Sequence, residues 1–173
     1  MAEFICNEIT YLLPGELIVT SEPMKISTVL GSCVSVCMYD REMKIGGMNH
    51  YMMPFYKKED DLPLKYGDTS LRILLNKMIQ AGARKNRIFV RIYGGASVLR
   101  IENSTINVAE KNIGAAYDFV KEHNLVVNSV EVGGHKGRKV VFDTLAGVIS
   151  CSFLREIKSA TNWNSINLLG IES

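Results

Sequence analysis

The sequence has little net charge and lacks any long hydrophobic run. Its 173 residues include 20 lysines and arginines against 18 aspartates and glutamates, which leaves a net charge of +2. Proteins that bind nucleic acid usually present a clustered basic face, so no nucleic-acid partner is expected. We interpret the small cluster Lys136, Arg138 and Lys139 as a solvated turn. Because no apolar run approaches the roughly 18 residues that a membrane span requires, no membrane insertion is expected either.

The sequence also lacks the features of a secreted or zinc-binding protein. Acidic residues stand near the N-terminus where a secretory signal would carry basic ones, which predicts a cytoplasmic protein. In that reducing compartment the four cysteines, Cys6, Cys33, Cys37 and Cys151, are expected to remain thiols. The three histidines do not supply the regular ligand spacing of a zinc site.

The apolar pattern predicts strands and two helices. Alternation of apolar and small side chains is typical of strands, and apolar residues repeated at helical spacing predict a helix from capping residues 68–70 to Gly82. A second helix is expected from about Asn107 or Asn112 to His123. Strands are expected over 16–20, 26–30, 33–39, 45–53, 87–93, 125–132, 139–142 and 147–153, the last two joined as a hairpin.

This set of predicted helices and strands favours an α+β fold, with two helices laid on a predominantly antiparallel sheet. The chain is long enough for one domain with a sizeable core. We assign this domain to residues 1–153. Residues 154–173 form a C-terminal extension, which contains the only tryptophan, Trp163, and is expected to be a short amphipathic helix or an interaction arm.

The run Gly31-Ser32-Cys33 has the chemistry of a nucleophile turn. A glycine lets the backbone turn sharply, and amides freed by the turn can face a developing oxyanion. A thiol needs a base nearby because its reactive form is the thiolate. His50, at the end of a strand that returns beside Cys33, is the expected partner. The alternative is that Cys33 is a small core hydrophobe, as most buried cysteines are.

Two longer motifs resemble the signature of the chemoreceptor glutamine deamidase family, CheD. They are Leu30-Gly-Ser-Cys-Val-Ser-Val-Cys-Met-Tyr-Asp40 and Ile45-Gly-Gly-Met-Asn-His-Tyr-Met-Met-Pro54. The similarity continues through Lys65-Tyr-Gly-Asp68, Tyr93-Gly-Gly-Ala96, Asn112-Ile-Gly114 and the glycine-rich stretch from Val132 to Lys139. It covers about residues 14–153.

The resemblance implies a catalytic set. The family carries its nucleophile at the cysteine of Gly-Ser-Cys, which is Cys33, and its base at the histidine of Met-Asn-His, which is His50. A family threonine six positions before the cysteine orients the histidine, and Ser27 stands there in this chain. Thr28 has the right residue type one place later, but along an extended chain it would point to the other face. Ser27 is therefore expected to be the third catalytic residue.

The resemblance further implies what the site does. Gly31, Ser32 and Asn49 are expected to bind the substrate or its oxyanion. The expected fold is a layered α/β/β sandwich similar to Cys-His deamidating toxins, and no cofactor or metal is required. The expected reaction converts glutamine side chains of methyl-accepting chemotaxis receptors to glutamate through a Cys33 thioester, with release of ammonia. A CheC-type phosphatase is a further expected partner.

Three other interpretations remain open from the sequence. The chain could be another thiol amidase, such as a transglutaminase, which primary amines as acceptors would reveal. It could be a regulatory module that binds receptor or phosphatase without catalysis, in which case Cys33 would show no depressed pKa. The loop 133–138 could bind an anion, although it lacks the strand–loop–helix context of a phosphate loop.

Overall fold

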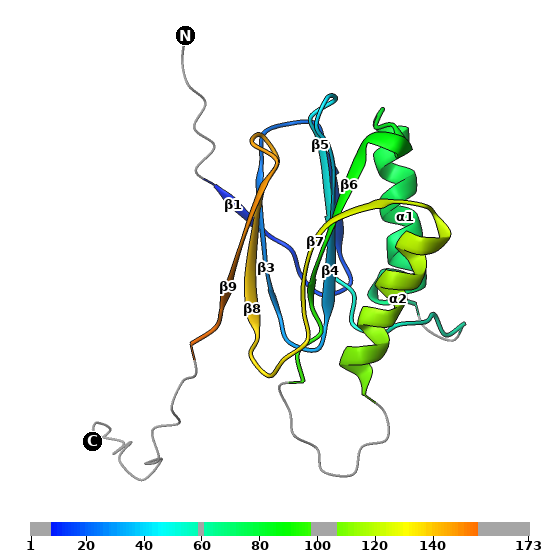
Figure 1. Cartoon of the computed structure of the whole chain (residues 1–173), viewed down its shortest axis with the longest axis vertical. Coiled ribbons are helices and arrows are strands. Elements are labelled where there is room, and N and C mark those ends of the chain that lie inside the picture. Colours follow the sequence, from blue (N-terminus) through cyan, green and yellow to red (C-terminus); the bar gives the residue numbers. More distant parts are fainter. Residues whose placement is uncertain (1–7, 59–60, 98–106, 156–173) are drawn as a thin grey trace, which may run out of the picture.

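The computed structural model describes residues 8–58, 61–97 and 107–155, which form three layers (Figure 1). Two helices cover one face of a five-stranded sheet of order β2-β5-β4-β6-β7, and a four-stranded sheet of order β1-β3-β8-β9 packs on its other face. The helices are α1 (Gly67–Gln80) and α2 (Val108–Glu122). The strands are β1 (Ile9–Tyr11), β2 (Leu17–Thr20), β3 (Lys25–Leu30), β4 (Val34–Asp40), β5 (Ile45–Asn49), β6 (Ile88–Gly94), β7 (Val126–Val132), β8 (Arg138–Asp143) and β9 (Val148–Phe153).

Both sheets are mixed. The ladders are antiparallel except at one edge of each sheet, where β1 runs parallel to β3 and β7 runs parallel to β6. The hairpin expected around residues 143–147 is confirmed, because β8 and β9 pair antiparallel across it. The described residues are consistent with the α+β class expected from the sequence, and neither of their helices is long and apolar enough to cross a membrane.

The helix ends agree with the sequence in part. Gly82 follows α1 with a φ of 109°, and Asn124 follows α2 with a φ of 50°, so both adopt the left-handed conformation that ends a helix. Asn107 caps α2 by accepting a hydrogen bond from the Glu110 amide at 3.2 Å, so the earlier of the two expected starts is correct. The capping residues expected for α1 are wrong. Its N-cap is Tyr66, without a side-chain hydrogen bond.

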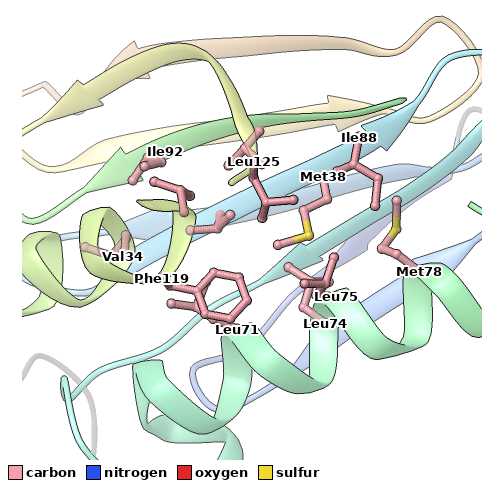
Figure 2. Close-up of a cluster of buried hydrophobic side chains, with 14 of the residues drawn as sticks. Val34, Met38, Leu71, Leu74, Leu75, Met78, Ile88, Ile92, Phe119 and Leu125 are labelled. Atoms are coloured by element: carbon pink, nitrogen blue, oxygen red, sulfur yellow. The ribbon is translucent and has the colours of Figure 1, made fainter. Parts of the chain in front are cut away.

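Strand β4 divides two apolar cores because its successive side chains point to opposite faces. Val34, Val36 and Met38 face the helices and belong to the same core as Leu71, Leu74, Met78 and Phe119. Figure 2 labels Val34 and Met38 among these side chains. Cys37 and Tyr39 face the four-stranded sheet and belong to the second core. This second core lies between the two sheets, and the layer that contains it is called the inter-sheet layer below.

Three features differ from the expected pattern or lie outside the described residues. Strand β1 was not expected, because three residues are too few to show alternation. Strand β5 ends at Asn49 rather than continuing to residue 53. Cys6, Trp163 and all of the expected extension beyond residue 155 lie outside the part of the chain that the structure describes.

Candidate active site

Strand register brings Cys33 and His50 to the same layer. Val34 and Tyr51 exchange two backbone hydrogen bonds of 3.0 Å across β4 and the chain that follows β5. One step along this antiparallel register, His50 faces Ser35, and Cys33 is its diagonal neighbour on the same face. Cys33 packs against the inter-sheet core. Diagonal neighbours of this kind lie about 7–8 Å apart at their backbones, within reach of an imidazole.

The His50 ring is held by Thr28. Its Nδ1 lies 2.8 Å from Thr28 Oγ1, and that hydroxyl donates its single proton to the Leu12 carbonyl at 2.7 Å. The hydroxyl oxygen therefore accepts from Nδ1–H, which makes Nε2 the unprotonated nitrogen of the neutral ring. Nε2 is buried and has no hydrogen-bond partner among the described residues. The structure thus leaves a lone pair on Nε2 in the inter-sheet layer, as a general base requires.

Burial also keeps the ring neutral. His50 is only 2 % exposed, and this desolvation lowers its pKa below the ordinary 6.5, although the Leu12 carbonyl and the Glu16 carboxylate oppose the shift. The protonated, cationic form of His50 is therefore disfavoured at neutral pH. A neutral imidazole can take a proton from a thiol.

The expectation that Ser27 orients the histidine is wrong. Ile26, Thr28 and Leu30 alternate toward the inter-sheet layer along β3, so Ser27 points to the opposite face. Its buried hydroxyl has no hydrogen-bond partner among the described residues. The prediction assumed that Ser27 and Cys33, six positions apart, point to the same face of one extended chain. The assumption failed because a bend at Gly31-Ser32 separates β3 from β4, and these strands belong to different sheets. The signal that could have identified Thr28 is its place between two apolar residues of the same face.

Substituting Thr28 with valine is expected to lower kcat by about tenfold to a hundredfold, because a ring that loses its hydroxyl support is misplaced. The valine keeps the shape of threonine. The matched control is Ser27→Ala, which removes a neighbouring buried hydroxyl from the other face of the same strand and should leave kcat unchanged. Steady-state kinetics and thermal unfolding of both variants provide the measurement. A larger loss of kcat in Ser27→Ala than in Thr28→Val would contradict this assignment.

Three consecutive backbone carbonyls of the nucleophile turn, residues 31–33, accept hydrogen bonds from other segments of the chain. The Gly31 carbonyl accepts from the Ala96 amide at 2.8 Å, and the Cys33 carbonyl accepts from the Gly95 amide at 2.8 Å. Between them, the Ser32 carbonyl accepts from the Asn112 side chain at 3.0 Å. The turn is therefore fixed by the segment after β6 and by α2 rather than by its own strand.

Gly94 allows this close contact. It has a φ of 109°, and a Cβ placed on it would collide with the Cys33 carbonyl oxygen. Gly94→Ala is therefore expected to lower the free energy of unfolding by more than about 2 kcal/mol. Gly114→Ala is the control, because its Cβ would meet nothing within 4 Å on α2. It should leave stability unchanged or raise it by up to about 1 kcal/mol. Denaturant melts measure both, and equal stabilities would contradict the packing described here.

The Cys33 thiol is neutral in the resting protein. Burial raises its pKa above the ordinary 9.0, and its own backbone amide opposes the rise. No hydrogen bond joins the Cys33 thiol to His50 Nε2, and both groups are neutral, so this structure holds no thiolate–imidazolium pair.

Asn49 does not face this layer, so its expected contact with substrate is wrong. Its Oδ1 accepts from the Val36 amide at 2.8 Å, and its Nδ2 donates to Ser70 Oγ at 2.9 Å. These bonds tie β4, β5 and α1 together on the helix side of the sheet. Gly31 and Ser32 do lie in the nucleophile turn, as the motif required.

The remaining histidines and thiols have other roles. His123 stacks on Phe119 with ring centroids 4.1 Å apart, which supports a structural role. His135 is exposed, with Nδ1 3.3 Å from the Ser97 carbonyl. Burial raises the pKa of Cys37 to about 12 and that of Cys151 to about 11, so neither is a ready nucleophile. The described residues contain no cluster of three or more histidine, cysteine or acidic side chains that could hold a metal ion.

The loop 133–138, considered above as an anion site, contains an arginine that is bonded within the protein. Arg138 is 4 % exposed and donates to the Gly133 carbonyl at 2.8 Å, and its guanidinium lies over the Phe153 ring at 5.1 Å. The guanidinium therefore stabilises the loop that joins the two sheets. This arrangement gives no support to an anion site at residues 133–138.

The fold and site together describe an α+β domain in which a half-buried thiol and a hydroxyl-anchored imidazole share the layer between two sheets. Comparison with known proteins shows which family this domain is similar to. A family model described as "CheD chemotactic sensory transduction" matches residues 52–152. A protein of Trichlorobacter lovleyi named "Probable chemoreceptor glutamine deamidase CheD" is 37% identical over 139 residues, which cover 80% of this chain and 86% of that protein.

Two further relatives carry the same name. One, from Methanococcus vannielii, is 38% identical over 146 residues, 84% of this chain and 95% of its own length. The other, from Thiobacillus denitrificans, is 37% identical over 158 residues, 89% of this chain and 78% of its own. This chain belongs to the CheD family.

Proposed function

We propose that this chain is a protein-glutamine deamidase that converts glutamine side chains of methyl-accepting chemotaxis receptors to glutamate. The observation that carries the proposal is the buried, unpartnered Nε2 of His50 in the same layer as Cys33, with Nδ1 held by Thr28. The names of the relatives supply the substrate. The proposal places the protein in the cytoplasm, where receptor signalling domains lie, and includes a likeness in fold and chemistry to Cys-His deamidating toxins.

The reaction proceeds in two halves. Cys33 Sγ attacks the carboxamide carbon while its proton passes to His50 Nε2, and the backbone amide of Cys33 stabilises the oxyanion. The imidazolium then protonates the amide nitrogen, the C–N bond breaks, and ammonia leaves a γ-glutamyl thioester. His50 takes a proton from water, the hydroxide attacks the thioester, and the thiolate leaves and regains its proton. The chain supplies every group in these steps, so no cofactor is invoked.

The test uses a purified receptor signalling fragment. Incubation with the protein should release one ammonia for each glutamine that mass spectrometry finds converted to glutamate. Products joined to an added primary amine, formed in preference to glutamate, would instead indicate a transglutaminase. A CheC-type phosphatase, if it docks at the same site, should inhibit the conversion competitively.

The competing proposal is a binding module without catalysis. The raised pKa of Cys33 favours it, because an activated nucleophile often has a lowered pKa. In that case the receptor fragment would bind, but neither ammonia nor glutamate would form. Detection of stable binding without any conversion would decide for the module.

The pH dependence distinguishes general-base catalysis from a resting ion pair. Neutral His50 is the active form, and its pKa lies below 6.5, so kcat/KM should fall only as pH drops through that lower value and stay level across neutral pH. Alkylation of Cys33 by iodoacetamide should still be rising beyond pH 9.0, because its pKa lies above that value. Rapid alkylation that continues down to about pH 5 would reveal a resting thiolate and contradict this mechanism.

A further inference from the structure

The side-chain amide of Asn112 connects the nucleophile turn to the segment that follows the base. This residue lies on α2 and is completely buried. One N–H of its Nδ2 donates to the Ser32 carbonyl at 3.0 Å, and the other donates to the Met52 carbonyl at 2.8 Å. Ser32 immediately precedes Cys33, and Met52 lies two residues after His50. A single planar amide therefore spans the two segments that carry the reacting groups.

The bond to Ser32 fixes the direction of the Cys33 amide. The Ser32 carbonyl and the Cys33 N–H belong to one planar trans peptide, so they point in opposite directions. No cis peptide bond occurs in the described chain. Because Asn112 holds the Ser32 carbonyl toward α2, the Cys33 N–H must point in the opposite direction, away from α2 and toward the inter-sheet layer that the Cys33 thiol contacts. None of the backbone hydrogen bonds of the described turns and loops uses this N–H, so it is available to a ligand.

The neighbouring peptides are locked in the same way. Ala96 and Gly95 hold the carbonyls on either side of the Ser32 carbonyl, so the whole turn presents one backbone orientation. A separate bond joins the backbone of α2 to the segment that follows the base: the Tyr51 hydroxyl donates to the Asn112 backbone carbonyl at 2.6 Å. Tyr51 is the residue directly after His50, so this contact attaches α2 to the same segment through a second group.

We propose that Asn112 is a positioning residue for the deamidation, which orients the Cys33 backbone amide toward the oxyanion of the tetrahedral intermediate and holds the nucleophile turn in register with His50. The inference rests on the proposed function. A positioning role for Asn112 differs from a purely structural role in one measurable respect. Loss of the Asn112 side chain should slow the steps that develop an oxyanion more than it slows reactions of the thiol that develop none.

The test compares Asn112→Ala with Tyr51→Phe. Both variants remove buried hydrogen bonds between α2 and the segment after β5, but only the first releases the Ser32 carbonyl. Asn112→Ala should lower kcat for deamidation about a hundredfold, as loss of an oriented oxyanion donor does, while KM changes little. Iodoacetamide alkylation of Cys33 displaces iodide without forming an oxyanion, so its rate should change by less than about threefold. Tyr51→Phe should keep kcat near that of the wild type.

Each outcome is decisive. The proposal is overturned if Asn112→Ala keeps its kcat, if alkylation falls in parallel with turnover, or if Tyr51→Phe loses as much activity. Should Asn112→Ala not fold, Asn112→Asp, which keeps the side-chain shape but loses the donors, takes its place with the same expectations for kcat and KM. Failure of both variants to fold assigns Asn112 to stability and overturns the proposal. A wild type that releases no ammonia overturns the proposed function and this inference with it, whereas an active wild type with an equally active Asn112 variant overturns the inference alone.

Discussion

Replacing Cys33 with alanine is expected to reduce receptor deamidation by about 10⁴-fold or more, to the level of the uncatalysed reaction. The reason is that no other described group can form the thioester. Cys37 is fully buried and has a pKa of about 12, and Cys151 has a pKa of about 11. The measurement is the rate of ammonia release with a receptor fragment, supported by mass spectrometry of the modified glutamines.

The control for this variant is Cys151→Ala. Cys33 and Cys151 are both thiols of intermediate exposure that pack against the inter-sheet core, so the two substitutions remove similar contacts. Cys151→Ala should therefore match Cys33→Ala in thermal stability while it retains wild-type turnover. Equal loss of activity in the two variants would show that the layer, rather than the Cys33 thiol, is what catalysis needs.

Replacing His50 with asparagine is expected to lower kcat by about 10²- to 10⁴-fold, the usual contribution of a positioned general base. An asparagine side chain can still donate to Thr28 Oγ1, as Nδ1 of the ring does, but it has no basic nitrogen at the place of Nε2. The acid limb of the pH profile should disappear along with the activity, because that limb reports the His50 pKa. Kinetics measured between acid and neutral pH provide the test.

The matched control is His123→Asn, since His123 stacks on Phe119 at the end of α2, and Phe119 belongs to the core on the helix side of the sheet. Its removal should leave both kcat and the pH profile unchanged. Retention of the acid limb in His50→Asn would mean that another group accepts the Cys33 proton. That result would exclude His50 as the base.

Burial in the inter-sheet layer explains why Cys33 and His50 are both neutral. A thiol and an imidazole taken out of water both shift toward their uncharged forms, which raises the pKa of Cys33 and lowers that of His50. Charge then develops only when a substrate is attacked, inside an environment of weak dielectric screening where fixed amides act strongly. We expect this design to protect the thiol from adventitious reagents at neutral pH.

Much of the fold could be predicted from local pattern. The alternation in β4 and the apolar stripe of α1 are strong signals, because both elements bury one face against a large core. Strand β1 could not be predicted, since its pairing with β3 depends on partners distant in sequence. The early end of β5 follows from the contacts of residues 51–53 with Val34 and Lys65, which alternation does not encode.

The site was predictable only where chemistry and motif agreed. Cys33 and His50 are marked by the glycine turn and by the returning strand. The choice of Ser27 over Thr28 was wrong because the alternation of side chains between two faces is not continued across the bend that separates β3 from β4. The prediction for Asn49 failed because Asn49 directly precedes His50 in extended chain, so its side chain faces the opposite layer. Asn112 was recognised as part of a motif, but only the folded contacts reveal that it reaches Ser32.

The most direct test of the account is to intercept the thioester. Receptor fragment is incubated with the protein in the presence of hydroxylamine, and the modified side chains are identified by mass spectrometry. The account predicts γ-glutamyl hydroxamate at the same positions that otherwise become glutamate, and none with Cys33→Ala. Glutamate formed at full rate without any hydroxamate, or hydroxamate formed equally by Cys33→Ala, would contradict it.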